Sequence, residues 1–176
     1  MRKLLSILFL LLSSIVSAQI PAESVVAVKA PGQKFQFVHK QTGAPANQLL
    51  WDETDAFVNG VARVFLNNQF SFVNSTGNLI YPTVLEDARS FSNGLAAVKK
   101  DGKWSFLTET GKILFPFAYD IVFDFEGTVS VAFENKKWWL INNTGDAVMP
   151  LDISVCYGFK NGVAKIIKDE KEGILY

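Results

Sequence analysis

Hydrophobic and polar positions alternate along most of the chain in short runs, and pairs of turn-forming residues separate these runs. Val61–Leu66 and Gln69–Val73 are two such runs, with Asn67-Asn68 between them. Alternation at every second position is typical of a β-strand, because successive side chains of a strand point to opposite faces. Asparagine tolerates a positive φ angle, so the pair predicts a tight turn. The pattern therefore predicts a β-hairpin over residues 61–73.

A second stretch repeats the pattern with a stronger turn signal. Leu95–Val98 is the first run, and Asp101-Gly102 is a preferred pair for a two-residue hairpin turn. The returning run places Trp104 and Phe106 on one face. We also expect a third short strand over residues 113–115, ending at the proline that follows because proline cannot donate a ladder hydrogen bond. Each stretch is thus a predicted meander of about three strands.

These elements recur with a period of 34 residues. The columns are phenylalanines (Phe57, Phe91, Phe125, Phe159), rings in the returning strand (Phe70, Trp104, Trp138), acidic residues (Asp52, Glu86, Asp120) and Thr-Gly pairs (Thr42-Gly43, Thr76-Gly77, Thr110-Gly111, Thr144-Gly145). A fixed period of this length indicates an array of stacked units, none of which buries its apolar face alone. We number the units 1 to 5, over residues 24–50, 51–84, 85–118, 119–152 and 153–176. Unit 1 is degenerate, and Gly127 in unit 4 stands one place early, which predicts a shortened loop compensated by the next hairpin.

The predicted fold class is all-β. We expect an open, curved, solenoid-like array of about four and a half β-hairpin repeats, because β-branched and aromatic runs are separated by Gly, Asn and Asp turns. A small closed propeller is the alternative, although propeller blades usually contain more residues than this period offers.

The sequence with these repeated columns resembles the WG (or KWG) repeat family of bacteria. The matching residues are Tyr119-Asp120, Phe91, Asn93-Gly94, Asp101-Gly102-Lys103-Trp104 and Thr110-Gly111-Lys112. The glycine that follows the tryptophan in the family is Ser71, Ser105 or Trp139 here, and only Gly173 retains it. The resemblance extends from about residue 24 to residue 176. It implies a β-repeat fold, and it implies no particular activity, because the family has no single agreed one.

The first 18 residues have the pattern of a secretory signal peptide. Arg2 and Lys3 precede a short apolar core, Leu4–Leu12, and Val16-Ser17-Ala18 is a small-residue cleavage site. The core is short for a membrane span, so an uncleaved anchor is the less favoured alternative. We expect a mature domain over 19–176, with no transmembrane span, that is secreted, periplasmic or on the outer cell surface.

Charge and composition narrow the function classes. Without Arg2 and Lys3 the chain has 15 basic and 17 acidic residues, a net charge of about −2, so a nucleic-acid partner is not expected. Cys156 is the only cysteine and His39 the only histidine, too few for a typical zinc site or a disulfide. A buried, inert thiol is the favoured interpretation of Cys156. There is no clustered Gly-rich phosphate loop, so no cofactor or metal is expected.

Three features could bear function. The acidic column Asp52, Glu86 and Asp120 could supply a pair of hydrolytic carboxylates, but a repeated acid is better explained as capping a turn. The ring column of Trp104 and Trp138 could stack on sugars, but alternation favours an interior spine. Trp139 stands where other units have small residues, so it either fills a local gap or contacts a ligand.

The sequence as a whole predicts a non-catalytic module of the cell envelope or exterior. Its partner would be a protein, a peptide or another cell-wall component such as a glycan, because repeat arrays present extended surfaces. The alternatives are a glycosidase-like hydrolase that uses acidic residues, and a purely structural envelope protein.

Overall fold

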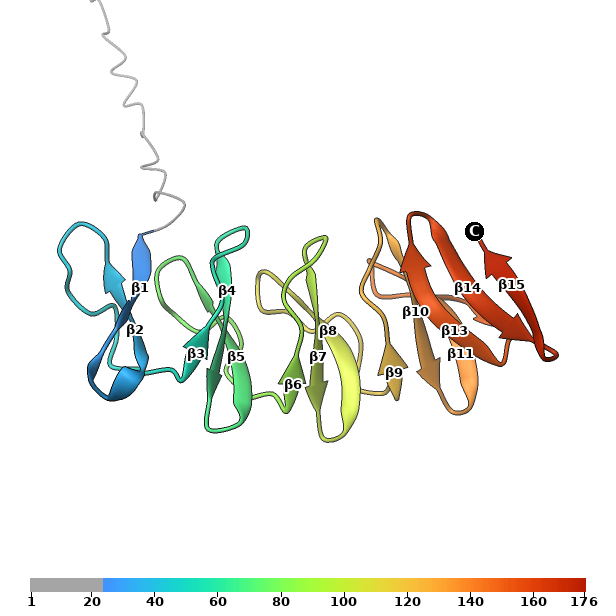
Figure 1. The fold of residues 1–176 in the computed structure, drawn as a ribbon, viewed down its shortest axis with the longest axis horizontal. Helices are drawn as coiled ribbons and strands as arrows, with labels where there is room; N and C mark the ends of the chain where they lie inside the picture. The colour runs from blue at the N-terminus through green and yellow to red at the C-terminus, as the bar shows by residue number, and fades with distance from the viewer. Residues whose placement is uncertain (1–23) are drawn as a thin grey trace, which may run out of the picture.

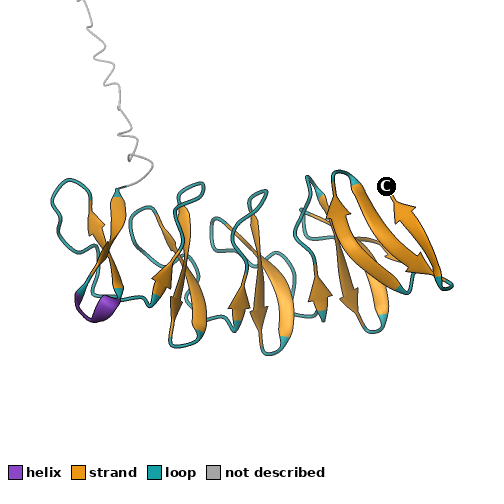
Figure 2. Ribbon diagram, viewed as in Figure 1, coloured by secondary structure: helices purple, strands orange, loops and turns teal. Residues whose placement is uncertain are grey.

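The computed structural model describes residues 24–176, so the expected signal segment lies outside the described residues. In this part of the chain, five antiparallel β-sheets stand in a row along the long axis of the molecule (Figure 1). Loops connect the strands, and a short 3-10 helix, η1 (Pro31–Gln33), lies between the first two strands (Figure 2). Among residues 24–176, no helix has the length and apolar character needed to cross a membrane.

Each sheet is formed by one unit. The strands are β1 (Val25–Lys29) and β2 (Phe35–His39) in unit 1; β3 (Glu53–Thr54), β4 (Val61–Leu66) and β5 (Gln69–Asn74) in unit 2; β6 (Asp87–Ala88), β7 (Leu95–Lys100) and β8 (Lys103–Thr108) in unit 3; β9 (Ile121–Val122), β10 (Val129–Glu134), β11 (Lys137–Asn142) and β12 (Ala147–Leu151) in unit 4; and β13 (Val155–Lys160), β14 (Val163–Lys168) and β15 (Lys171–Leu175) in unit 5.

The strand positions reproduce the 34-residue period of the sequence. β4, β7, β10 and β14 begin at residues 61, 95, 129 and 163, and their hairpin partners β5, β8, β11 and β15 begin at residues 69, 103, 137 and 171. The predicted turns form as expected: Asn67 and Asn68 have φ angles of 52° and 61°, and Asp101 has a φ angle of 51°. The prediction of an open all-β array is confirmed, and the closed propeller is not formed.

The hydrophobic core consists of layers between successive sheets. In unit 3, Leu95 and Phe106 face unit 4, which we call the forward face, whereas Val98 and Leu107 face unit 2. All four side chains are at most 7% exposed. Because both faces of an internal hairpin are covered, its strands are hydrophobic at nearly every position, as buried strands require. Each unit therefore depends on its neighbours for its stability.

The phenylalanine column bridges consecutive units. Phe91 packs edge-on against Phe72 of the preceding unit, with ring centroids 5.1 Å apart, and Phe125 packs against Phe106 in the same way at 4.8 Å. Phe57 packs against a phenylalanine of unit 1 at 5.5 Å. Edge-to-face pairs of this kind add about 0.5–1.5 kcal/mol each beyond the area they bury. The column is thus an inter-unit contact that recurs along the array.

The prediction of a third strand over residues 113–115 was wrong. Only an isolated bridge between Leu107 and Ile113 forms there. A full third strand after the hairpin forms in unit 4, where β12 pairs with β11 and contains Pro150. β12 is the edge of its sheet, so a proline is tolerated because one side of the strand needs no ladder hydrogen bond.

The shortened loop predicted at Gly127 was also wrong. The bridge between Ser92 and Leu95 encloses two turn residues, and the bridge between Glu126 and Val129 encloses the same number. Gly127 simply occupies the first turn position, with a φ angle of 61°, where unit 3 has an asparagine. The change is one of turn type, and no residue is lost or recovered.

Candidate functional site

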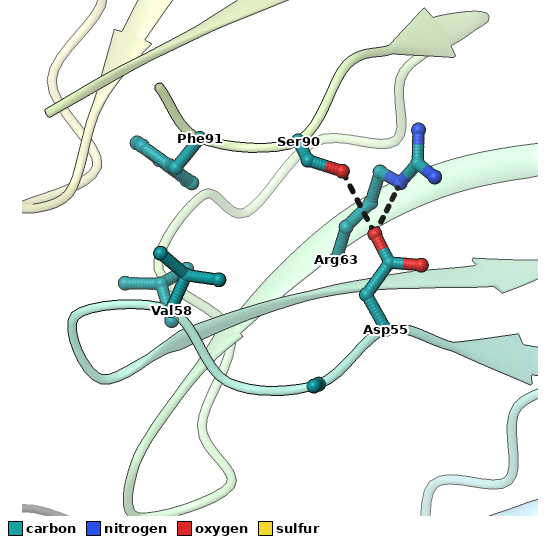
Figure 3. Close-up of a pocket in the computed structure, with 7 residues that line it drawn as sticks. Asp55, Val58, Arg63, Ser90 and Phe91 are labelled. Carbon is teal, nitrogen blue, oxygen red and sulfur yellow. Dashed lines mark hydrogen bonds and ion pairs between the residues drawn. The ribbon is translucent and has the colours of Figure 1, made fainter. Parts of the chain in front are cut away.

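The structure contains a groove between units 2 and 3 (Figure 3). Its volume is about 390 Å³, and its lining residues are Asp55, Ala56, Val58, Val61, Arg63, Ser90 and Phe91. Val58 and Phe91 lie on one side, and Asp55, Arg63 and Ser90 converge on the other. The groove therefore has an apolar half and a polar half.

The polar half is a bridge between the two units. Asp55 Oδ2 accepts hydrogen bonds from Arg63 Nε and from Ser90 Oγ, both at 3.0 Å. Arg63 also donates from a terminal nitrogen to the Ala88 carbonyl at 2.6 Å, and its guanidinium lies 5.3 Å from the centroid of the Phe70 ring. These contacts fix the orientation of the charged groups at the end of the groove.

The apolar half is open to solvent. Val58 is 49% exposed, Phe91 is half-buried, and Val61 forms a buried wall at 5% exposure. Apolar surface with a few fixed polar groups beside it is the usual composition of a ligand site. An apolar side chain of a ligand could cover Val58 and Phe91 while its polar atoms meet Asp55 or Ser90.

An asparagine makes different contacts at this groove and at the equivalent place between units 3 and 4. Asn93 Nδ2 donates to the Phe125 carbonyl at 2.7 Å across units 3 and 4, and Phe125 is only 3% exposed. The equivalent residue one period earlier, Asn59, instead donates to Glu109 Oε1 at 3.1 Å. Phe91, the counterpart of Phe125, is half-buried.

The acidic column lies elsewhere, at successive hairpin turns. Asp52 accepts hydrogen bonds from the Lys34 ammonium at 2.5 Å and from the backbone N–H of Asn67 at 3.0 Å. These bonds, led by the one from Lys34, lower the pKa of Asp52 below its usual value. Glu86 accepts a bond from the backbone N–H of the Gly102 turn. The two acids thus have the arrangement of turn caps.

Asp120, the third acid of the column, resembles Asp52 in pairing with a lysine of the preceding unit. Its carboxylate forms an ion pair with Lys103, the first residue of β8 in the preceding unit. Both side chains are 43% exposed. None of the three column acids lines the groove between units 2 and 3.

The three tryptophans of units 3 and 4 lie in different environments. Trp138 is 4% exposed and donates from Nε1 to the Ser154 carbonyl at 3.2 Å. Trp104 is half-buried, with the Arg89 guanidinium 5.0 Å from its ring centroid. Trp139 is half-buried and packs against the cluster between units 3 and 4. It therefore fills space between the units, and its role as a ligand contact stays a prediction.

Comparison with known proteins identifies the repeat. Residues 70–104 and 105–138 match the family profile described as "WG containing repeat". The chain carries WG repeats. No curated protein matches the chain.

Among solved structures, the crystal structure of BamB from Moraxella catarrhalis is similar at 12% sequence identity with a TM-score of 0.43. The match covers 86% of this chain and 53% of that one, so the chain spans about half the length of that protein. At this TM-score the likeness carries no argument about function.

The two matched WG repeats meet within unit 3. Each ends on a tryptophan of the ring column, Trp104 or Trp138. Of the residues that line the groove, Ser90 and Phe91 fall within the first match, whereas the unit 2 side of the groove precedes residue 70 and lies outside both matches.

Within residues 24–176, no group of three or more His, Cys, Asp or Glu side chains could hold a metal ion. Cys156 is 3% exposed, and burial raises the pKa of its thiol, which keeps it protonated and unreactive at neutral pH.

Sequence reasoning missed Asp55, Arg63 and Ser90. The available signal was Arg63, which occupies a column where unit 3 has Ala97 and unit 4 has Val131. A charged residue in a column that is apolar in the next two units calls for a partner.

Proposed function

We propose that this chain is a non-catalytic WG-repeat module, secreted or held in the cell envelope, that binds an extended segment of a partner protein. The groove between units 2 and 3 is the binding site in this proposal. The observation that carries it is the exposed Val58 and the half-buried Phe91 beside a fixed Asp55–Arg63 pair, whereas Phe125, the counterpart of Phe91, is buried between units 3 and 4. Its volume of about 390 Å³ falls in the range of ligand clefts, about 300–1,000 Å³.

The groove composition favours a peptide over a glycan. Its exposed surface is a valine and the edge of a half-buried phenylalanine, and Arg63 and Ser90 already bind Asp55. Few donors and acceptors are thus left for the many hydroxyl groups of a sugar, whereas an apolar peptide side chain needs mainly apolar surface. A cell-wall glycan is therefore the second choice of ligand.

The geometry of the acidic column supports the non-catalytic part of the proposal. Two carboxylates that hydrolyse a glycosidic bond lie about 5–10 Å apart and in unlike environments. Asp52 and Glu86 instead each cap the turn of their own hairpin. The signal-like segment before residue 19 supports export.

A pair of matched substitutions tests the binding site. Val58→Glu places a charge in the groove, and Val148→Glu places one on β12; the two valines are 49% and 51% exposed. The probe is a library of displayed random peptides selected on the unmodified chain, and each selected peptide is then titrated against both variants. We expect Val58→Glu to weaken binding at least about tenfold, because desolvating a carboxylate against an apolar side chain costs more than about 1.4 kcal/mol. Equal affinities of the two variants would refute the groove.

Export is tested independently of binding. The full chain with a C-terminal tag is produced in a bacterial host, and the cell fractions and the medium are examined. We expect the tagged protein outside the cytoplasm, with an N-terminus near Gln19. An intact N-terminus on cytoplasmic protein would contradict the export part of the proposal and leave the groove proposal unaffected.

A further inference from the structure

The fifth sheet, β13–β15, has an outer face that no other sheet of residues 24–176 covers (Figure 1). Val163 and Ile174 lie on this face at 43% and 65% exposure, and Tyr157 lies there at 56%. A depression of about 410 Å³ runs over it, lined by Val163, Lys165, Glu172, Gly173 and Ile174.

The repeat shows that this is the forward face of the unit. Val163 stands three periods after Val61, and Ile174 stands two periods after Phe106. In units 2 and 3 these side chains are buried against the next unit, with Val61 at 5% and Phe106 at 1% exposure. Positions that are buried in units 2 and 3 are thus left uncovered in unit 5 among residues 24–176.

A polar pair at the centre of the face is compatible with a covered surface. Lys165 Nζ forms an ion pair with Glu172 at 2.7 Å and lies 6.0 Å from the Tyr157 ring centroid. Lys165 stands three periods after Arg63, which is on the forward face of unit 2 and donates to the Ala88 carbonyl of unit 3. The array therefore already contains a cation at this position inside an inter-unit contact.

We propose that this outer face, defined by Tyr157, Val163, Lys165, Glu172 and Ile174, is an interface between two copies of this chain related by a two-fold axis. The surface is self-complementary in charge, since it contains one basic and one acidic residue side by side. A two-fold rotation that relates the two copies brings Lys165 of each copy against Glu172 of the other. Isologous contacts of this kind are the commonest in homo-oligomers.

Charge and burial favour a second copy over an unrelated partner. A face with a balanced pair offers an unrelated protein no net charge to recognise, whereas a rotated copy supplies the matching pattern automatically. The apolar residues around the pair would then be covered, as their counterparts are within the array.

Charge-swapped variants test this interface. The mass of the purified full chain is measured by sedimentation equilibrium over a range of concentrations, and we expect a reversible monomer–dimer equilibrium. Lys165→Glu makes the face acidic and Glu172→Lys makes it basic. Each variant alone should dimerise at least about tenfold more weakly, because like charges then face one another. An equimolar mixture of the two should form a heterodimer.

The mixture is decisive because loss of an intrachain ion pair alone would not produce a heterodimer. Ile174→Lys should abolish dimerisation, whereas Ile121→Lys, at a 43% exposed isoleucine on β9, should not. Val58→Glu should leave the dimer unchanged, so failure of the groove and failure of the interface are distinguishable. A monomer at all concentrations, a mass that grows beyond the dimer, or monomers in the mixture would overturn the proposal.

Discussion

Four glycines at equivalent positions offer a test of how the units pack. Gly43, Gly77, Gly111 and Gly145 end the Thr-Gly pairs of units 1 to 4, with φ angles of +68°, +84°, +82° and +101°. A left-handed backbone of this kind explains a glycine at each turn. It predicts that the four Gly→Ala substitutions would have similar costs.

The surroundings of the four glycines are nevertheless different. A Cβ atom on Gly111 would lie 1.8 Å from the Ile80 carbonyl oxygen of the preceding unit. A Cβ on Gly145 would lie 3.1 Å from the Leu114 carbonyl oxygen, whereas a Cβ on Gly43 would meet nothing within 4 Å. Gly43 lies in unit 1, which has no preceding unit among the described residues. The glycine therefore provides close approach between units as well as a turn.

The magnitudes follow from adding these two effects. Alanine in a left-handed conformation costs about 1–2 kcal/mol, and this is the whole expected cost of Gly43→Ala. In Gly111→Ala the new methyl group must also displace a backbone carbonyl that cannot rotate away, and overpacking of this kind costs about 1–3 kcal/mol more. We expect a total of about 2–5 kcal/mol for Gly111→Ala, and an intermediate cost for Gly145→Ala.

Urea unfolding followed by tryptophan fluorescence measures these costs as changes in the free energy of unfolding. Gly43→Ala is the control for Gly111→Ala, because the two glycines share the φ region but a Cβ on Gly43 would contact no other unit. If the two substitutions cost the same, the close approach of Gly111 to unit 2 is refuted, and the glycine column would reflect turn conformation alone.

Three further predictions concern single side chains. Trp138→Phe should destabilise the protein more than Trp51→Phe, by about 0.5–1.5 kcal/mol in urea unfolding. Both indoles are at most 5% exposed, but Trp138 donates a hydrogen bond whereas the Trp51 N–H has no partner within residues 24–176. Equal losses of stability would contradict this prediction. Asp52→Asn should reduce stability at neutral pH. Its difference in unfolding free energy from the unmodified chain should shrink as the pH falls below the usual aspartate pKa of 3.8, because a lowered pKa in the folded state stabilises only the ionised form. A difference that is constant from pH 7 to pH 2 would contradict this prediction. Asn93→Ala should open the contact at Phe125, seen as faster amide hydrogen exchange in the turn after that residue, because it removes the 2.7 Å hydrogen bond that closes it; unchanged exchange would contradict it.

Much of the fold could be predicted because its causes are local. The 34-residue period, the tight turn at Asn67-Asn68 and the opposite faces of Phe106 and Leu107 all follow from turn chemistry and strand alternation. The third strand of each unit could not be predicted in the same way. β12 pairs with β11 at four positions, with a bulge between Leu140 and Ile141, whereas the equivalent segment at Ile113 forms a single bridge. Residues in the same column of the repeat therefore need not pair in the same way.

The contacts beside the groove could not be predicted because they include a choice of hydrogen-bond acceptor. Asn59 and Asn93 are the same residue in the same column, yet the first binds Glu109 and the second binds the Phe125 carbonyl. Glu109 is 50 positions from Asn59, so the competition between the two acceptors is invisible in the local sequence. A repeat that predicts equivalent turns can therefore still give inequivalent surfaces.

Two arginines show why comparison by column misses part of the inter-unit contact. Arg63, on β4, donates to the Ala88 carbonyl of the next unit, and Arg89, just after β6, donates to the Val122 carbonyl of the unit after it. Ala88 and Val122 are one period apart, but the two arginines are not. Equivalent carbonyls in successive units are therefore bound by arginines from different positions in the unit. Each guanidinium also lies over the ring-column residue of its own unit. The repeated feature is a backbone carbonyl between units that accepts a hydrogen bond from a guanidinium group. Because a long arginine side chain can reach this carbonyl from different positions in the unit, the arginines do not recur with the period of the repeat.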